Sequence, residues 1–511
     1  MSTARDAITG ARSRTASSTF FASASFMCSS SECRREHPPR RACPSAPRGY
    51  ILDAAMTSPA DASPPSPPET LPLPPGSSGL PLIGETLEYL RSSRAFAERR
   101  QRQYGAVFRS HVLGSPAAFL LGPEAVQWIF AGEGKYLKNR WSPGVRRLLG
   151  AHCLAMLEGN EHLERRRLLA PHFSYASMRG FVPIIESLSR RHFERWTARP
   201  GDFTLWPAMR ELAFEIALAL IFGQDTVDLP FLMHHFKAWT AGLFSPFPID
   251  LPWTTFGRAL ASKKAMIGYL EQVVAERQAR TEQPPDLLGS LLQRREGEEP
   301  LSRAAIVDEL QLLLFAGHDT TVTAMSNLML MLAQHPDVLQ RGREAVAGLE
   351  GPLTLEGMRA TPYLVQLLHE GMRTIPPIGG AFRVTTRDVA FNGYRIPKGW
   401  TVPVSIKMAH AGANWPTPDR FDPERFGGEN PEQKKPGTFI PFGGGPRICL
   451  GQHFAMVEMS VMLILLLKHH AWELVPGQDL EYTQVPFPKP RSGIQLEFRR
   501  IDAGERPLAE P

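Results

Sequence analysis

The sequence has no apolar run long enough to cross a membrane. A transmembrane helix needs about 18 or more consecutive apolar residues. One of the longest apolar runs, Val461 to Leu467, covers less than half of that length. We therefore expect no transmembrane anchor.

Cysteine is scarce, with five residues in 511. Cys28, Cys33 and Cys43 lie in a Ser-, Arg- and Pro-rich segment that shows no helical or strand period. Only Cys153 and Cys449 remain for the rest of the chain, which excludes a disulfide scaffold and favours a reducing compartment. We expect a cytoplasmic protein, or an organellar one if the N-terminal segment is a transit peptide.

Excess charge is also lacking outside the N-terminus. The formal net charge is +6, but residues 1–50 hold eight Arg, no Lys and three acidic residues, a net of +5. The remaining chain has 49 basic (57 − 8) against 48 acidic (51 − 3) residues. A nearly neutral body gives no reason to expect nucleic acid as a partner.

The chain divides by composition into three parts. Residues 1–72 are predicted to be a disordered extension, or an upstream addition if translation starts at Met56. Residues 73–500 carry the periodic, apolar patterns of one folded domain, and residues 501–511 form a C-terminal tail.

Residues 442–451 read Phe-Gly-Gly-Gly-Pro-Arg-Ile-Cys-Leu-Gly and precede a largely apolar helix that we expect to run to Leu467. Three glycines and a proline predict a tight loop that carries Cys449 to the start of this helix. Turn N–H groups and the helix dipole are expected to lower the thiol pKa and make a soft iron ligand. Arg447 adds a charge that could pair with a carboxylate of a bound group. For this motif alone, the alternatives are a buried core cysteine and a glycine-rich loop that is only a turn or a phosphate cradle.

In this motif the sequence resembles the cytochrome P-450 family, whose haem-binding signature it matches at every defining position. The resemblance implies heme b (iron-protoporphyrin IX), with Cys449 as the axial ligand of the iron and Phe442 and Arg447 in the haem loop. It also implies a mainly α fold, a helical triangular prism with a small β region around one haem.

A second motif lies within a pattern that predicts one helix from the N-cap Ser302 to Gln334. Its centre, residues 315–321, reads Phe-Ala-Gly-His-Asp-Thr-Thr, which places a glycine and a charge inside an apolar helix. The resemblance implies that Ala316 and Gly317 leave room for dioxygen at a kink, and that Asp319 and Thr320 supply protons. A structural kink with a capped threonine is the alternative.

The remaining cofactor residues come from two other segments. His162 and Arg166 are four apart in a predicted helix and share one face. The resemblance implies that both bind the haem propionates, and that Arg383 does so from the segment 376–383. A solvated basic face is the alternative for the first pair.

Three charged residues are expected to be structural. Glu370 and Arg373 lie three apart on one predicted helix, and Arg425 follows in the motif Phe-Asp-Pro-Glu-Arg-Phe. The resemblance implies a buried triad that braces the haem-loop core. Two β-hairpins are also predicted, one with strands at residues 107–112 and 117–121 joined by residues 113–116, and one around Asn392-Gly393.

The implied activity is that of a monooxygenase, which inserts one oxygen atom from dioxygen into a lipophilic substrate. The partner would be a separate ferredoxin or flavodoxin with its reductase, docking on candidate residues Arg165, Arg167, Lys434 and Lys435, and the protein would be a monomer. Segments such as 79–86 and 376–383 resemble the branch of retinoic acid hydroxylases and their cyanobacterial relatives, which implies a retinoid-like or other isoprenoid substrate. Fatty acid or sterol hydroxylation, a peroxide-driven or isomerising reaction, and a non-enzymatic haem sensor are the alternatives.

Overall fold

The computed structural model describes residues 69–501, apart from residues 82, 200–202, 224, 226, 246, 285, 294–299, 413, 429–432 and 486. Residues 502–511 of the predicted tail, and the predicted N-terminal extension as far as residue 68, lie outside the described residues. Within the described part of the chain, no helix is both long and apolar enough to span a membrane.

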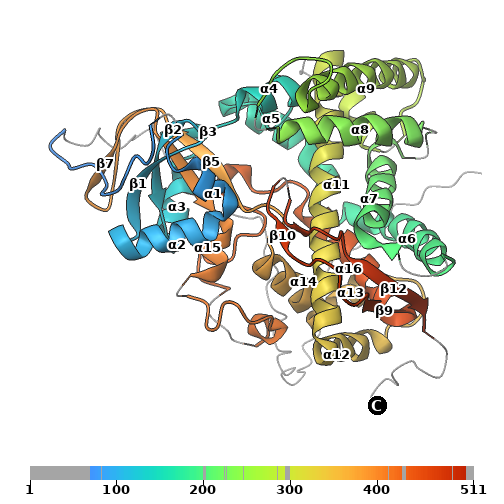
Figure 1. Cartoon of the computed structure of the whole chain (residues 1–511). Helices are drawn as coiled ribbons and strands as arrows, with labels where there is room; N and C mark the ends of the chain where they lie inside the picture. Colours follow the sequence, from blue (N-terminus) through green and yellow to red (C-terminus); the bar gives the residue numbers. More distant parts are fainter. Residues whose placement is uncertain are drawn as a thin grey trace, which may run out of the picture. The chain divides into compact units, whose positions relative to one another are not determined.

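Helices dominate the described residues (Figure 1). In chain order they are α1 (Thr86–Arg91), α2 (Ser93–Tyr104), α3 (Pro123–Gly132), α4 (Pro143–Leu149), α5 (Gly159–Leu169), α6 (Val182–Thr197), α7 (Leu205–Phe222), α8 (Leu229–Leu243), α9 (Thr255–Gln278), α10 (Leu287–Leu292), α11 (Arg303–Gln334), α12 (Pro336–Ala347), α13 (Leu355–Arg359), α14 (Pro362–Thr374), α15 (Ile406–Ala411) and α16 (Gln452–His469). Short 3-10 turns lie at η1 (Ala170–Phe173), η2 (Ser177–Gly180), η3 (Pro423–Phe426) and η4 (Gly445–Arg447).

Helix α11 is the long central element of the helical region (Figure 1). Its 32 residues span about 48 Å at ~1.5 Å per residue. Ser302 caps it by accepting a hydrogen bond from Ala305 N, as the sequence predicts. Helices α7, α14 and α16 pack against it, so its side chains are buried on most sides and form much of the core.

The strands form one larger sheet and three small ones. The five-stranded sheet has the order β1-β2-β8-β5-β3, and the small sheets are β10-β11, β4-β12-β9 and β6-β7. The strands are β1 (Val107–Val112), β2 (Ser115–Leu120), β3 (Leu137–Asn139), β4 (Phe203–Thr204), β5 (Gly380–Thr385), β6 (Val389–Phe391), β7 (Tyr394–Ile396), β8 (Thr401–Ser405), β9 (His470–Leu474), β10 (Tyr482–Thr483), β11 (Lys489–Pro490) and β12 (Gln495–Arg500).

Both predicted hairpins are present. Strands β1 and β2 pair antiparallel across Leu113 and Gly114, and strands β6 and β7 pair across Asn392 and Gly393. All four turn residues have positive φ, the backbone twist that two-residue hairpins require. The first hairpin differs from the prediction at one end, because Ser115 and Pro116 already belong to β2.

Candidate functional site

The loop before α16 is closed by its own backbone. Cys449 N donates to Phe442 O at 2.9 Å, and Gly443 and Gly445 adopt positive φ. Gly444 lies against the ring of Phe130 in α3, since an added Cβ there would lie 2.4 Å from Phe130 Cε2. The loop therefore needs glycine both for its turns and for this close packing.

The thiol of Cys449 is free and accessible, although protein surrounds it closely enough to desolvate it. We infer that it faces an internal space. Burial raises the pKa of this thiol, while the Gly451 N–H and the charge of Arg166 act in the opposite direction. The expected lowering of the pKa is therefore wrong for the free thiol, because desolvation outweighs the turn.

Helix α5 carries the predicted pair His162 and Arg166 toward the same space. Burial, then the charges of Arg447 and Arg166, lower the pKa of His162 to about 4, so its imidazole is neutral near pH 7. Burial also lowers the pKa of Arg166, whereas the Cys449 sulfur raises it. Arg166 has no acidic partner among the described residues, so its guanidinium is available to donate hydrogen bonds to an added carboxylate.

The other two predicted propionate ligands have protein partners. Arg383 Nη2 lies 3.2 Å from one oxygen of Glu133, and Arg447 Nε lies 2.9 Å from the other. Arg447 also binds Glu158 at 2.8 Å. Arg383 Nε is buried without a hydrogen-bond partner. The site thus offers a thiol that could bind iron, together with Arg383 Nε and Arg166 as donors for carboxylates. This set fits an iron group that carries carboxylates.

The centre of α11 is open on one side. Ala316 is exposed and its neighbours Phe315 and Gly317 are half-buried, whereas most of α11 is buried; an added Cβ at Gly317 would meet nothing within 4 Å. Thr320 Oγ1 donates back to Ala316 O at 2.7 Å. Helix α11 is continuous through Gly317, from Arg303 to Gln334.

Asp319 is held as a carboxylate on the neighbouring face of α11. Burial alone would raise its pKa, but the adjacent His318 ring and the charges of Arg210 and Lys489 bring the pKa below its usual value. Asp319 Oδ1 lies 3.1 Å from Arg210 Nε and 3.2 Å from His318 Nδ1. Neither Arg210 nor His318 was predicted from the sequence to act at the site, although His318 adjoins Asp319.

Glu458 is a second buried carboxyl that was not predicted from the sequence. It accepts a hydrogen bond from Thr321 Oγ1 at 3.2 Å and so joins α16 to α11. Burial raises the pKa of Glu458 to about 8, against a smaller opposing effect of the Thr321 hydrogen bond. A lone acid in the apolar run of α16 was the available signal.

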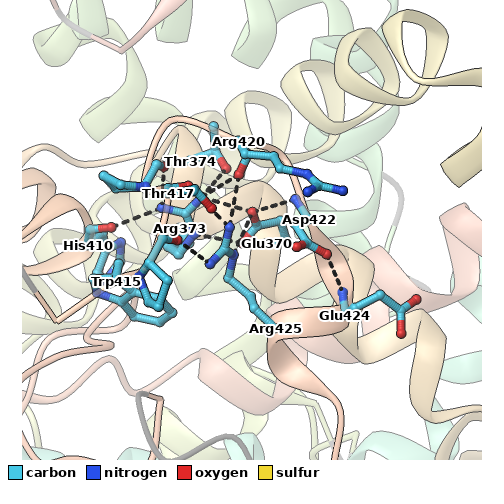
Figure 2. A network of polar contacts seen from close by, with 12 residues as sticks. Glu370, Arg373, Thr374, His410, Trp415, Thr417, Arg420, Asp422, Glu424 and Arg425 are labelled. Carbon is cyan, nitrogen blue, oxygen red and sulfur yellow. Dashed lines mark hydrogen bonds and ion pairs between the residues drawn. The ribbon is translucent and has the colours of Figure 1, made fainter.

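The three charged residues predicted as a structural triad meet in a buried cluster (Figure 2). Glu370 lies 2.6 Å from Arg373 and 3.1 Å from Arg425. Arg373 also donates to His410 O, and His410 Nε2 accepts from Ile440 N at 2.9 Å. The cluster thereby reaches the chain two residues before the Cys449 loop.

Apolar side chains gather beside the open part of α11. Phe315 lies 6.2 Å from Phe244 and 6.4 Å from Phe487, measured between ring centroids. These rings come from the end of α8, from α11 and from the segment between β10 and β11. Together they provide an apolar wall next to Ala316.

The prediction that Arg165 belongs to a docking surface for a redox partner is wrong. Arg165 is buried and binds Glu309 of α11 at 2.8 Å, so it cannot meet a partner protein. Arg165, Arg166 and Arg167 are consecutive in a helix and therefore point in different directions.

A family model described as Cytochrome P450 matches residues 74–498 of this chain. A putative cytochrome P450 120 from Synechocystis is 35% identical over 84% of this chain and 98% of its own length. Cytochrome P450 26A1 from Xenopus laevis is 34% identical over 84% of this chain and 90% of its own. The solved structure of retinoic-acid-bound cyanobacterial CYP120A1 superposes with a TM-score of 0.80 at 35% identity, covering 84% of this chain and all of that one.

Proposed function

Because this chain belongs to the cytochrome P450 family and is a monooxygenase of that family, we propose that it hydroxylates a retinoid-like or other isoprenoid compound. The observation that carries the substrate proposal is the likeness to a structure solved with retinoic acid bound. The apolar wall of Phe244, Phe315 and Phe487 supports it, since such a wall suits a long lipophilic molecule.

The family implies a haem cofactor, and we propose heme b held within a domain of residues 73–500. Cys449 would bind the iron, and His162, Arg166, Arg383 and Arg447 would bind the propionates. Phe442, Ala316 and Gly317 would line the faces of the ring. When bound, the haem supplies the activation of dioxygen.

The chain's own residues would direct the substrate and the protons. The Phe244, Phe315 and Phe487 wall excludes water from the reacting carbon. Thr320 Oγ1 donates its proton to Ala316 O, which leaves its oxygen free to accept a hydrogen bond from the open side. Asp319, kept ionised, can take up a proton and pass it on near Thr320.

Electrons would come from a separate ferredoxin or flavodoxin with its reductase. We further propose a monomer that acts in the cytoplasm. Reconstitution with a ferredoxin system and with a flavodoxin system, with product measured per electron consumed, tests the proposed source of electrons.

Two measurements test this function. The reduced carbon-monoxide complex should show the red-shifted Soret band of thiolate ligation, and Cys449→Ser should lose it; an unshifted wild-type band would overturn the assignment. Titration with retinoic acid, a sesquiterpene, a long-chain fatty acid and a steroid, followed by the haem spin state, tests the substrate. A response to the fatty acid alone would replace the isoprenoid proposal.

A further inference from the structure

Glu133 occupies a fixed position between two arginines that are distant in sequence. It follows directly after α3, in the turn that leads to β3, and its side chain is almost fully buried. Strand β3 pairs with β5, which places Asn139 opposite Arg383. Phe130, three residues earlier on α3, packs on Gly444 of the Cys449 loop. The turn thus holds the Glu133 carboxylate between β5 and that loop.

The carboxylate accepts a hydrogen bond from Arg383 and forms an ion pair with Arg447, so it lies between the two guanidinium groups. One oxygen lies 3.2 Å from Arg383 Nη2 and the other 2.9 Å from Arg447 Nε. Arg447 also lies close enough to Arg166 for their charges to repel, which contributes to the lowered pKa of Arg166. The buried negative charge of Glu133 offsets the mutual repulsion of the positive charges that gather here on Arg166, Arg383 and Arg447.

Both arginines keep donors that Glu133 does not use. Arg383 Nε is buried without a partner, and Arg447 Nη1 makes no hydrogen bond or ion pair within the described part of the chain. A carboxylate that fixes one edge of a guanidinium also fixes the direction of its other N–H groups.

We infer that Glu133 is a positioning residue for the haem, which orients Arg383 and Arg447 so that their remaining donors meet the propionates. This inference rests on the proposed haem function. Glu133 does not touch the reacting atoms, and it acts through the two arginines as an outer partner of cofactor ligands does.

Glu158 provides a matched control. It binds the same Arg447 at 2.8 Å, but its side chain is 43% exposed and it contacts no second cation of this site. An exposed ion pair contributes little, so Glu158→Gln should leave haem binding nearly unchanged.

The test uses the full-length haem protein and follows haem transfer to excess apomyoglobin, together with the haem reduction potential. Glu133→Gln should dissociate haem about tenfold faster or more than the wild type. It should also raise the reduction potential, because a lost negative charge near the propionates favours the added electron. Glu133→Asp retains the charge but shortens the bridge, so it should speed haem loss while leaving the potential close to that of the wild type.

The rate of haem loss in Glu133→Gln decides whether Glu133 positions the two arginines. A wild-type rate of haem loss in Glu133→Gln would overturn the inference, and slower loss would show that Glu133 competes with the propionates. Should Glu133→Gln fail to fold, equal potentials and dissociation rates in Glu133→Asp and the wild type would overturn it instead. A wild-type protein that binds no haem would refute the proposed function itself.

Discussion

At the scale of single residues, Asp319 and Thr320 are neighbours with different constraints. Asp319 is fixed by His318 and Arg210, whereas the Thr320 hydroxyl has only the carbonyl of Ala316 as its hydrogen-bond partner in the described chain. That bond lies along the helix and can be exchanged for one to a group on the open side. Of the two residues, Thr320 is therefore the one whose hydroxyl we expect to change hydrogen-bond partners.

Thr320→Ala should keep haem and substrate binding but divert electrons to hydrogen peroxide. Without the hydroxyl, proton delivery is no longer controlled, and product per electron should fall by roughly tenfold or more. Thr320→Ser, which retains the hydroxyl, should remain close to the wild type. The measurement is product and peroxide formed per reductant oxidised, and an unchanged ratio in Thr320→Ala would contradict the assigned role.

Glu458 should make the stability of the folded protein depend on pH. Its folded pKa of about 8 lies above the unfolded value of about 4.3. Between these values the folded state binds more protons, so the free energy of unfolding falls as pH rises, by at most about 1.4 kcal/mol per pH unit. The contribution is fully present below the unfolded pKa and is lost as pH passes the folded one.

Glu458→Gln should flatten this dependence, because glutamine does not titrate. Apparent unfolding temperatures of the haem protein at pH 5, 6, 7 and 8 provide the measurement. The exposed Glu344→Gln serves as the control and should retain the wild-type slope. Equal slopes in Glu458→Gln and the wild type would show that Glu458 is already ionised at neutral pH.

At the scale of elements, local patterns predicted local structure. Helix α11 and both hairpins could be predicted from sequence, because their signals involve residues that are near neighbours in the chain. These signals are the cap at Ser302, the lack of proline as far as Gln334, and the two-residue turns. The roles of Glu133 and Arg210 could not be predicted in this way, because no local pattern marks them. Each has its partners on a segment of the chain that is distant in sequence. The triad of Glu370 was predicted only through the family resemblance.

The Glu370 cluster should stabilise the contact between α14 and the segment that leads to the Cys449 loop. Glu370→Gln would leave Arg373 and Arg425 buried without their shared negative charge, at a cost of about 3–5 kcal/mol in the free energy of unfolding. Denaturant unfolding monitored by circular dichroism gives the value. Glu186→Gln removes a pair with Arg190 on the surface of α6 and should cost at most about 0.5 kcal/mol. Equal losses in the two variants would refute a bracing role for Glu370.

At the scale of the whole molecule, the residues proposed to hold the cofactor come from segments that are far apart in the sequence. His162 and Arg166 lie on α5, Ala316 and Gly317 on α11, Arg383 on β5 and Cys449 in the loop before α16. The sequence could supply the residue types, but their meeting depends on the packing of α11 against α16 and on the pairing of β3 with β5. The first 73 residues contribute none of them, and the family match begins at residue 74.

Removal of residues 1–55 should therefore leave haem content and turnover unchanged. The composition of this segment gives it too little apolar surface to fold alone, and the assignment of the cofactor residues does not require it. The truncated and full-length proteins should give the same ratio of haem absorbance to protein and the same substrate-induced spin-state change. A matched deletion to residue 80 should behave differently, since it removes Pro75, whose carbonyl accepts from Arg109 N on β1 at 2.8 Å. If the shorter deletion also lost haem, the N-terminal segment would have to pack on the haem-binding part of the chain.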